Sequence, residues 1–444
     1  MNLLLLLACA GPKGPGDTAS VDGPTWYADV APIVVANCTA CHVSGGPAFD
    51  LTNAEAARGK ATLLADAVAD RRMPPWGAEG DDACTPEHGW EGDRRLAQEE
   101  IDTIVAWAEA GAPLGDGDAP APVEEPAPVA LEGDLLSYDA PSIYSSGTGA
   151  DEFLCFSLEL GLVESLWVDG IEVVPSNLEV AHHTLVLLDG NNDSEALAGE
   201  DGQYDCSGGL GLSNPTLLAT WVPGANPTTA PEGTGIEIPA GQRVVLQMHY
   251  HPARSPGLED QPTLKLRPLD SRPAQALHQI LLGNSWSEAT GLLPGPNDNG
   301  VVQFKIPAGA SDHTETMAAT FDDRIPEIPI PAIGAHMHLI SRGMRVWLDR
   351  ATPSAGESER ECLLSVPRYD YDWQQMYHDE RDVDEVSTVS GGDTLTVECT
   401  YDNTLDNPGT ARALSEAGMD EPVDVYLGEG TLDEMCLALV GYVY

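Results

Sequence analysis

The sequence predicts a multidomain protein in which a small all-α unit precedes two all-β sandwiches of jelly-roll type. Three observations predict this order. Apolar residues recur with helical spacing in the first quarter of the chain, residues 116–133 (DGDAPAPVEEPAPVALEG) form a Pro/Ala/acid spacer, and short apolar alternations between Gly, Pro, Asn and Asp clusters follow. Roughly 310 residues after the spacer are too many for one sandwich, so two are expected. The predicted units are a leader and tether (residues 1–23), the helical unit (24–115), the spacer (116–133) and the two sandwiches (134–270 and 271–444).

The charge of the chain excludes one class of partner. Its 444 residues include 71 Asp plus Glu against 21 Lys plus Arg, which gives a formal net charge of −50. A nucleic-acid binder needs clustered cations to neutralise phosphates, so no nucleic-acid partner is expected. Hydrophobic residues make up 42% of the chain, which is enough to form cores despite this charge.

The first residues predict export. Residues 2–10 (NLLLLLACA) are apolar but far too short to span a bilayer. They resemble the end of a bacterial lipoprotein signal, in which a lipidated cysteine, here Cys9, follows a short apolar run. A chance apolar terminus is the alternative. Together with nine cysteines, which suit an oxidising compartment, the pattern predicts an exported periplasmic or cell-surface lipoprotein with an acyl anchor in the membrane.

The secondary-structure patterns differ on the two sides of the spacer. Near the end of the first unit, five apolar residues fall on one face of a predicted helix: Leu96, Ile101, Ile104, Val105 and Ala108. After the spacer, residues 243–248 (RVVLQM) and 394–397 (TLTV) are typical of strands.

Cys38, Cys41 and His42 form a CxxCH motif, in which two thiols bond to the haem vinyl groups and the histidine binds the iron. From the composition, roughly 0.004 such motifs are expected by chance. A structural CxxC or a partial zinc site is the alternative, for which only Cys84 and His88 offer further ligands nearby.

Met73, within residues 72–76 (RMPPW), is predicted to be the sixth iron ligand. A thioether opposite an imidazole stabilises ferrous iron and suits electron transfer. His88 is the competing ligand, and simple packing of Met73 in a core is the other alternative. Residues 27–115 resemble small bacterial class I-like cytochrome c domains, and the resemblance implies one covalently bound haem c.

Three groups of histidines lie in the predicted β region: His182-His183, His249, and His336 with His338. Alternate residues of a strand share a face, so His336 and His338 can converge on one ion. The adjacent pair can share a metal only at a strand end or bulge, or by using different ring nitrogens. Imidazoles with a nearby thioether suit copper, whereas the HExxH pattern of a zinc protease is missing. Taken singly, each pair could instead be hydrogen-bonded core or surface histidine.

The order of these motifs resembles the copper type II, ascorbate-dependent monooxygenases, the family of the peptidylglycine α-hydroxylating and dopamine β-monooxygenases. The resemblance covers roughly residues 135–444 and rests on four segments: AHHTLVLL, VVLQMHYH, GAHMHL and TLDEMC. It implies two copper ions. His182, His183 and His249 would hold the electron-transfer copper, and the catalytic set His336, His338 and Met435 would hold the copper where oxygen binds.

The resemblance also implies two disulfides, Cys155–Cys206 and Cys399–Cys436. With Cys9 lipidated and two cysteines on haem, six cysteines remain, an even number that suits disulfides. Cys84 and Cys362 are left without an assignment, and free thiols are one alternative for them.

The remaining histidines and three aromatic residues are not predicted to bind metal. His251 is expected close to the ligands or at the surface, and three further histidines are expected to be structural: His278, His313 and His378. Core packing is expected for three aromatics near residue 371, with a pocket wall as the alternative: Tyr369, Tyr371 and Trp373.

The substrate is expected to differ from that of the amidating enzymes. Their carboxylate-binding Arg corresponds here to Gly334, and their peptide-holding Asn and Tyr correspond to Leu437 and Leu439. Without a bidentate carboxylate clamp, peptide amidation is not expected, and the pocket should be more apolar.

The predicted function is therefore a copper-dependent monooxygenase that hydroxylates a C–H bond of an unidentified small organic substrate with O₂. An external redox protein or ascorbate-like reductant would supply electrons through the tethered haem, since a spacer of this length would keep the donor at millimolar effective concentration. A non-catalytic copper-binding or electron-relay lipoprotein is the alternative. A haem-based sensor is weaker, because a Met-ligated iron has no vacant position.

Overall fold

The computed structural model describes residues 23–44, 48–115, 130–147, 152–207, 209–250, 256–296, 298, 300–354, 358–428, 430 and 432–444. Three predicted features lie outside the described residues: the lipidation site Cys9, most of the spacer, and His251, which was expected close to the ligands or at the surface. No helix in the described part is both long and apolar enough to cross a membrane.

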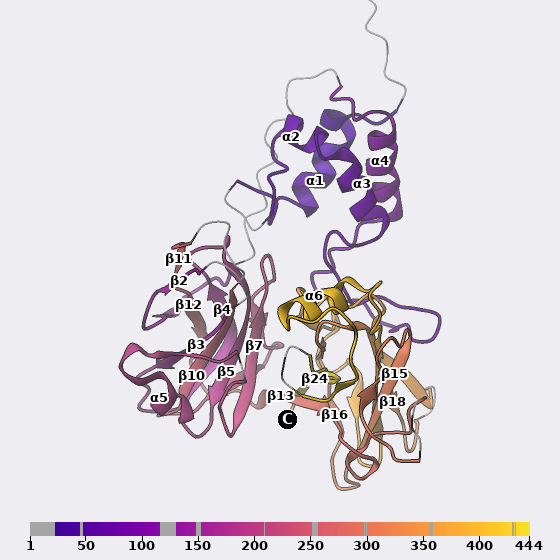
Figure 1. The fold of residues 1–444 in the computed structure, drawn as a ribbon. Helices are drawn as coiled ribbons and strands as arrows, with labels where there is room; N and C mark the ends of the chain where they lie inside the picture. Colours follow the sequence, from indigo (N-terminus) through magenta and orange to yellow (C-terminus); the bar gives the residue numbers. More distant parts are fainter. Residues whose placement is uncertain are drawn as a thin grey trace, which may run out of the picture.

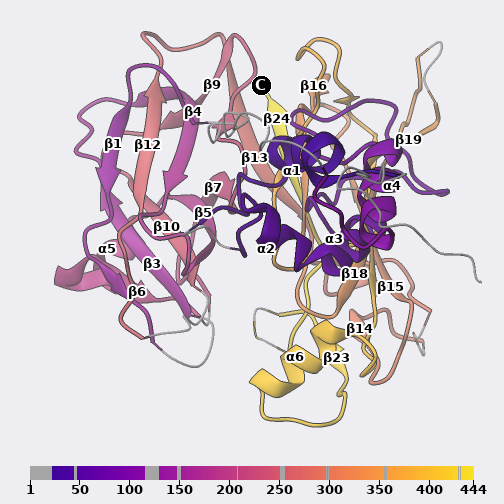
Figure 2. The ribbon, with the colours of Figure 1, turned by 90° about the horizontal axis from the view of Figure 1, so that it is seen from above.

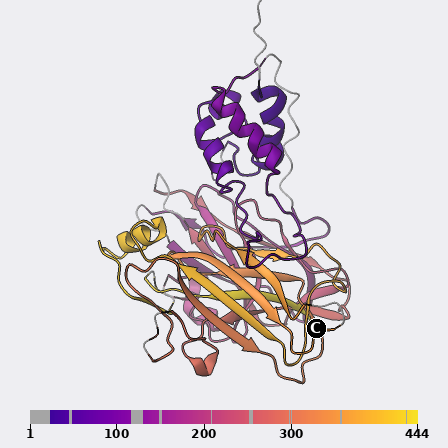
Figure 3. The ribbon, with the colours of Figure 1, turned by 90° about the vertical axis from the view of Figure 1, so that its right-hand side faces the viewer.

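The helical unit comes first in the chain and lies at one end of the molecule (Figures 1 and 3). It consists of a π-helical turn η1 (Trp26–Val30) and four helices: α1 (Ala31–Asn37), α2 (Ala54–Arg58), α3 (Ala61–Ala69) and α4 (Gln98–Glu109). Helix α4 begins where the Glu100 carboxylate accepts a hydrogen bond from the Ala97 N–H (2.8 Å), which caps the first turn. Its apolar face is the predicted one, and Ile101 and Ile104 are buried beside the Trp26–Trp107 ring pair.

The first sandwich packs two antiparallel sheets around one apolar core. Its strands are β1 (Leu136–Asp139), β2 (Tyr144–Ser145), β3 (Glu152–Glu159), β4 (Leu166–Val174), β5 (Ala181–Asp189), β6 (Gln203–Asp205), β7 (Pro215–Trp221), β8 (Thr228–Thr229), β9 (Thr234–Ile238), β10 (Arg243–Tyr250), β11 (Glu259–Asp260) and β12 (Thr263–Pro268), with α5 (Asp193–Ala198) and η2 (Gly199–Asp201) between β5 and β6. One sheet has the order β6-β3-β10-β5-β7, and the other contains β1-β12-β4-β9.

The second sandwich continues directly from the first. Its elements are β13 (Gln275–Gly283), η3 (Glu288–Thr290), β14 (Lys305–Ile306), β15 (His313–Thr320), β16 (Ile328–Pro329), β17 (Ala332–His336), β18 (Ser341–Asp349), β19 (Arg360–Val366), β20 (Met376–His378), β21 (Thr388–Val389), β22 (Thr394–Tyr401), α6 (Pro408–Glu416), β23 (Val425–Tyr426) and β24 (Leu437–Val443). One layer is β15-β22-β18-β19. The other, β13-β24-β17-β20, joins β9 of the first sandwich through a short parallel pairing of β13, so one sheet runs through both. The predicted β-sandwich architecture is confirmed.

Side-chain alternation directs one face of each inner strand toward the other sandwich. In β10, Val244, Leu246 and Met248 enter the first core, whereas Val245 packs in a separate cluster that joins the sandwiches. From the second sandwich, Ala332 and Leu439 enter this joining cluster. Residues at matching positions of β5, β10, β17 and β24 therefore face the boundary between the sandwiches.

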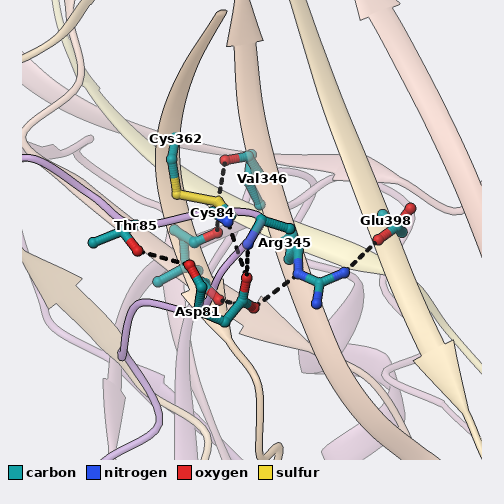
Figure 4. The surroundings of a disulfide bond; sticks show 10 residues. Asp81, Cys84, Thr85, Arg345, Val346, Cys362 and Glu398 are labelled. Carbon is teal, nitrogen blue, oxygen red and sulfur yellow. Dashed lines mark hydrogen bonds and ion pairs between the residues drawn. A yellow bond between two sulfur atoms is a disulfide. The ribbon is translucent and has the colours of Figure 1, made fainter.

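Residues 76–93, called the strap below, leave the helical unit and lie on the second sandwich. Trp76 and Trp90 are buried in its core against Tyr377, with ring centroids 5.2 and 5.8 Å away. A disulfide joins Cys84 to Cys362 of β19 (Figure 4). The sequence left these two cysteines unassigned, with free thiols as one alternative, and the structure pairs them instead. They lie 278 positions apart in different predicted domains, so local pattern carried no sign of their pairing.

The strap also carries a half-buried acidic contact. Asp81 accepts hydrogen bonds from Arg345 and Ser365 of the second sandwich (both 2.8 Å) and from the N–H groups of Ala83 and Cys84, and Arg345 also pairs with Glu398 (Figure 4). Together with the disulfide, these bonds fix the strap, and with it the helical unit, whose helices α1 and α2 lie over the boundary between the sandwiches (Figure 2).

Asp81→Asn is expected to weaken the attachment of the strap by about 1–2 kcal/mol at pH 7, because a charge-assisted hydrogen bond is lost. Burial raises the pKa of Asp81, but its hydrogen bonds, that from Arg345 foremost, lower it further and leave it below the usual value of 3.8. The ionised group therefore stabilises the fold above about pH 4, and this stabilisation is lost as the pH falls through the lowered pKa. Amide exchange of residues 76–93 should differ most between variant and wild type at pH 7, and the difference should shrink as the pH falls below 3.8. A difference that persists at low pH would contradict this account.

Candidate metal centres

His182, His183 and His249 come together on the boundary face of the first sandwich. His183 and His249 are opposite each other on β5 and β10, and a bulge at His249/Tyr250 leaves His182 as the extra residue. The bulge turns the side chains of His182 and His183 toward the same point. A bulge is one of the arrangements in which two adjacent residues of a strand can share a metal ion. The three Nδ1 atoms lie 3.0, 3.2 and 3.3 Å from one another.

This triangle of nitrogens has the dimensions of a metal-ligand set. Three nitrogens bound about 2.0 Å from one ion lie roughly 3.3–3.5 Å apart. The residues therefore fit a single ion bound through Nδ1, and an all-imidazole set suits copper in both of its common oxidation states. His249 is fully buried and His183 is 8% exposed, so water has little access to the group.

The surroundings of this cluster hold its rings in place. The Phe153 ring stacks on His249 with centroids 4.3 Å apart and planes within 3°. On the outer side, His182 Nε2 lies 3.7 Å from the Asp372 carboxylate, which comes from the second sandwich. A carboxylate behind a ligand imidazole orients the ring and raises its basicity. Asp372 was missed by the sequence analysis, since nothing local marks it as a neighbour of His182.

His336 and His338 lie at the end of β17, where their rings are 5.6 Å apart and at right angles. His336 Nδ1 is 2.6 Å from Gln374 Oε1, and His338 Nδ1 is 2.9 Å from the Asp433 carbonyl. Both acceptors require Nδ1–H, so both Nε2 atoms carry a lone pair. Burial and the neighbouring His338 lower the pKa of His336 to about 4, so the ring is neutral at pH 7, as a metal ligand must be.

Glu434 joins the backbone of Met435 to the segment that carries His336 and His338. The buried Glu434 carboxylate accepts hydrogen bonds from the N–H groups of His338 (2.9 Å), Ile340 (2.9 Å) and Met435 (3.1 Å) and from the Ser341 hydroxyl (3.0 Å). The segment carrying Met435 is thereby joined to the His336–His338 segment. This role of Glu434 was not predicted, because its place in the TLDEMC motif gives no sign of the residues that it contacts.

The structure pairs Cys399 with Cys436 and Cys155 with Cys206. The first disulfide follows Met435 directly, and the Tyr401 hydroxyl donates to the Met435 carbonyl (2.8 Å). Met435 is therefore fixed on both sides.

Gly334 has little room for a side chain. A Cβ at this position would lie 2.8 Å from the Gln375 carbonyl and 3.0 Å from the Met376 sulfur. Leu437 and Leu439 are buried, Leu439 in the cluster that joins the two sandwiches. The three positions at which a different substrate was predicted are therefore covered by other parts of the protein.

The CxxCH motif follows helix α1. Cys38 and Cys41 are unpaired, whereas the other six cysteines in the described residues form disulfides. Burial, with the nearby Cys41 and Glu100, raises the pKa of the Cys38 thiol to about 12. His42 Nδ1 is 2.9 Å from the Phe49 carbonyl, which leaves Nε2 available as a ligand, and the Met73 side chain is 39% exposed. Two free thiols and one oriented imidazole fit a covalently bound haem.

The further ligands of a zinc site at the CxxCH motif, Cys84 and His88, have other partners. Cys84 is in a disulfide, and His88 lies in the strap, where its ring is buried 3.4 Å from the Asp379 carboxylate. Neither is placed in the helical unit.

The remaining histidines have structural surroundings. His278 stacks on Tyr442, and His313 Nε2 lies 2.8 Å from Glu315. Burial lowers the pKa of His378, in β20, to about 4.

Comparison with known proteins gives a partial match. Peptidyl-glycine alpha-amidating monooxygenases A and B of Xenopus laevis are each 34% identical to this chain over 107 residues, 23% of the chain and 11% of those proteins. The chain thus spans about a tenth of the length of these relatives. The partial similarity agrees with the copper monooxygenase family suggested by the histidine and methionine motifs. No family model matches the chain.

Solved structures give only distant likenesses. The major capsid protein P2 from bacteriophage PM2 has a TM-score of 0.28 and 11% identity over 70% of this chain and 97% of that one. PNGase F, a glycosylasparaginase from Flavobacterium meningosepticum, has a TM-score of 0.26 and 8% identity over 70% of this chain and all of its own. At such TM-scores neither fold family nor activity is assigned.

Proposed function

We propose that this protein is a copper-dependent monooxygenase that hydroxylates a C–H bond of a small organic substrate with O₂ and receives electrons through a haem c on Cys38 and Cys41. The convergence of the His182, His183 and His249 Nδ1 atoms within 3.3 Å carries the proposal. The partial similarity to amidating monooxygenases supports the same class of reaction.

The two candidate centres provide different ligand sets. His182, His183 and His249 would hold one copper through Nδ1, and His336, His338 and Met435 would hold the other through two Nε2 atoms and a thioether. Bound copper would supply the one-electron steps and the activation of O₂. Burial lowers the pKa of His336 and His338 and so keeps these two imidazoles neutral at pH 7. Asp372, Gln374 and the Asp433 carbonyl contact ligand imidazoles, and Glu434 holds the backbone of Met435.

The covered Gly334 supports a substrate other than a peptide carboxylate. No Arg is placed there, and Gln375 and Met376 occupy the space that a side chain would need. We propose a small substrate without a carboxylate anchor.

Three disulfides support an exported protein, because such bonds persist mainly in oxidising compartments. Anchoring through a lipid on Cys9 in the periplasm or at the cell surface is part of the proposal, and its support is the apolar run before Cys9.

Metal analysis of the purified chain tests the proposal, together with an absorption spectrum of the pyridine haemochrome. We expect two copper ions and one haem c per chain. His249→Ala should lose one copper and keep the haem, whereas His278→Ala, which removes a histidine outside both clusters, should lose neither. A wild-type chain that takes up zinc but not copper would overturn the proposal.

A further inference from the structure

One segment of the second sandwich, residues 369–374, contacts both histidine clusters. The Tyr369 hydroxyl donates to the Met337 carbonyl (2.8 Å) and accepts from the Met337 N–H (3.0 Å), so it holds the residue between His336 and His338. Met337 is fully buried, which makes this a fixed point of the second cluster.

Two further side chains of the segment reach one ligand of each cluster. Gln374 Oε1 is 2.6 Å from His336 Nδ1, and Gln374 Nε2 donates to the Tyr371 carbonyl (2.8 Å), which fixes the orientation of the amide. Asp372 lies 3.7 Å from His182 Nε2. The two clusters are thus joined by three consecutive residues of chain, from Asp372 to Gln374.

The same segment contacts Arg94, the residue that follows the strap. The Arg94 guanidinium lies 5.4 Å from the centroid of the Trp373 indole, within cation–π range, and donates to the Gly224 carbonyl (2.6 Å). Arg94 thereby connects the second sandwich with the loop after β7 of the first.

That loop also touches the CxxCH motif. Cys41 Sγ is 3.7 Å from the Pro223 carbonyl, and Trp221, at the end of β7, pairs with Thr184 beside His183. Neighbouring groups therefore lead from Cys41 to the His182–His183–His249 cluster by two routes, both of which start at Pro223 and Gly224. One continues through Trp221 and Thr184, and the other through Arg94, Trp373 and Asp372.

We propose that residues 369–374 and Arg94 hold the helical unit and both histidine clusters in one fixed arrangement and form the electron route between them. The inference rests on the proposed function. With both groups bound, one electron would pass from ferrous haem to cupric copper at His182, His183 and His249, which would give ferric haem and cuprous copper without bond or proton changes. An external one-electron donor would then reduce the haem again. Arg94, Asp372 and Trp373 are positioning residues, and the first cluster is the point of entry.

The test combines the loaded and the metal-free protein. In protein with full haem and Cu(II), the haem is reduced by a light pulse and its reoxidation is followed optically, with the Cu(II) signal followed by electron paramagnetic resonance. Trp373→Leu should slow reoxidation about tenfold, because the contact geometry is lost, whereas Trp373→Phe keeps an aromatic ring and should stay near wild type. Asp372→Asn should alter the Cu(II) spectrum and lower copper affinity about tenfold.

The matched control is another half-buried tryptophan, Trp167, which has Arg272 at the same 5.4 Å distance but lies in β4, in the other sheet of the first sandwich. Trp167→Leu should leave reoxidation unchanged. In the metal-free protein, Arg94→Gln should raise amide exchange in residues 222–226, and Arg272→Gln should not.

The possible results distinguish failure of the electron route from failure of the proposed function. Unchanged reoxidation in Trp373→Leu, at full haem and copper content, would overturn the route and leave the proposed function standing. Unchanged exchange in Arg94→Gln would overturn the fixed arrangement. A wild-type chain that binds no copper or no haem would overturn the proposed function and the electron route with it.

Discussion

Met435→Ile is expected to reduce oxygen uptake about 100-fold or more while the protein stays folded. Substitution of residues that only contact metal ligands already lowers activity or metal affinity about 10–100-fold, and loss of a ligand should cost at least as much. Isoleucine has nearly the volume of methionine, and Met435 is only partly buried, so packing changes little. The thioether is lost, however, and with it the third ligand of the His336–His338 set. Oxygen uptake is measured with an electrode in the presence of a reductant, and copper content is measured in the same samples.

Copper content identifies the cause of the loss. Met435→Ile should retain the copper at His182, His183 and His249, which lies on the other sandwich. Met419→Ile is the matched control, since Met419 is also partly buried and follows helix α6, outside both clusters. Uptake by Met435→Ile equal to that of wild type would instead support the non-catalytic electron-relay protein.

Replacing both Cys84 and Cys362 with Ser is expected to lower the stability of the attached strap by about 2–4 kcal/mol, since the disulfide closes a very long loop. The double variant avoids an unpaired thiol. Hydrogen exchange of residues 76–93 should rise strongly, and Trp76 and Trp90 should become accessible to collisional quenchers.

The corresponding control removes Cys155 and Cys206. That bond lies within the first sandwich with a separation of 51 residues, so its loss should weaken the first sandwich and leave the strap protected. Equal exchange of the strap in both double variants would show that the Cys84–Cys362 bond does not hold it.

Much of the fold follows from local pattern in the sequence. Alternating apolar residues predicted strands such as β10 and β22, and helical spacing predicted the buried face of α4 around Ile101 and Ile104. The need for a bulge or strand end at His182 and His183 followed from strand geometry alone, and the structure has a bulge there. Each of these features depends on residues only a few positions apart in the sequence, so the local pattern of residues predicts it.

The features that join distant parts could not be predicted in this way. The strap has no periodic pattern, and its partner Cys362 is 278 positions away. Tyr369 and Trp373 were expected to serve as packing residues, yet residues 369–374 contact both histidine clusters and Arg94. Asp372 and Glu434 are common acidic residues in a chain with 71 of them, so nothing in their type distinguishes them. Their roles depend on tertiary contacts.

The position of Cys362 also sets an order of maturation. Domains generally fold in the order of their synthesis, so the helical unit, with Cys38 and Cys41, is complete long before β19 has been made. During that interval Cys84 has no partner, while Cys38 and Cys41 are already present as thiols. If the protein is exported and carries a haem as proposed, correct maturation would require either early attachment of the haem or reduced thiols until Cys362 has been made.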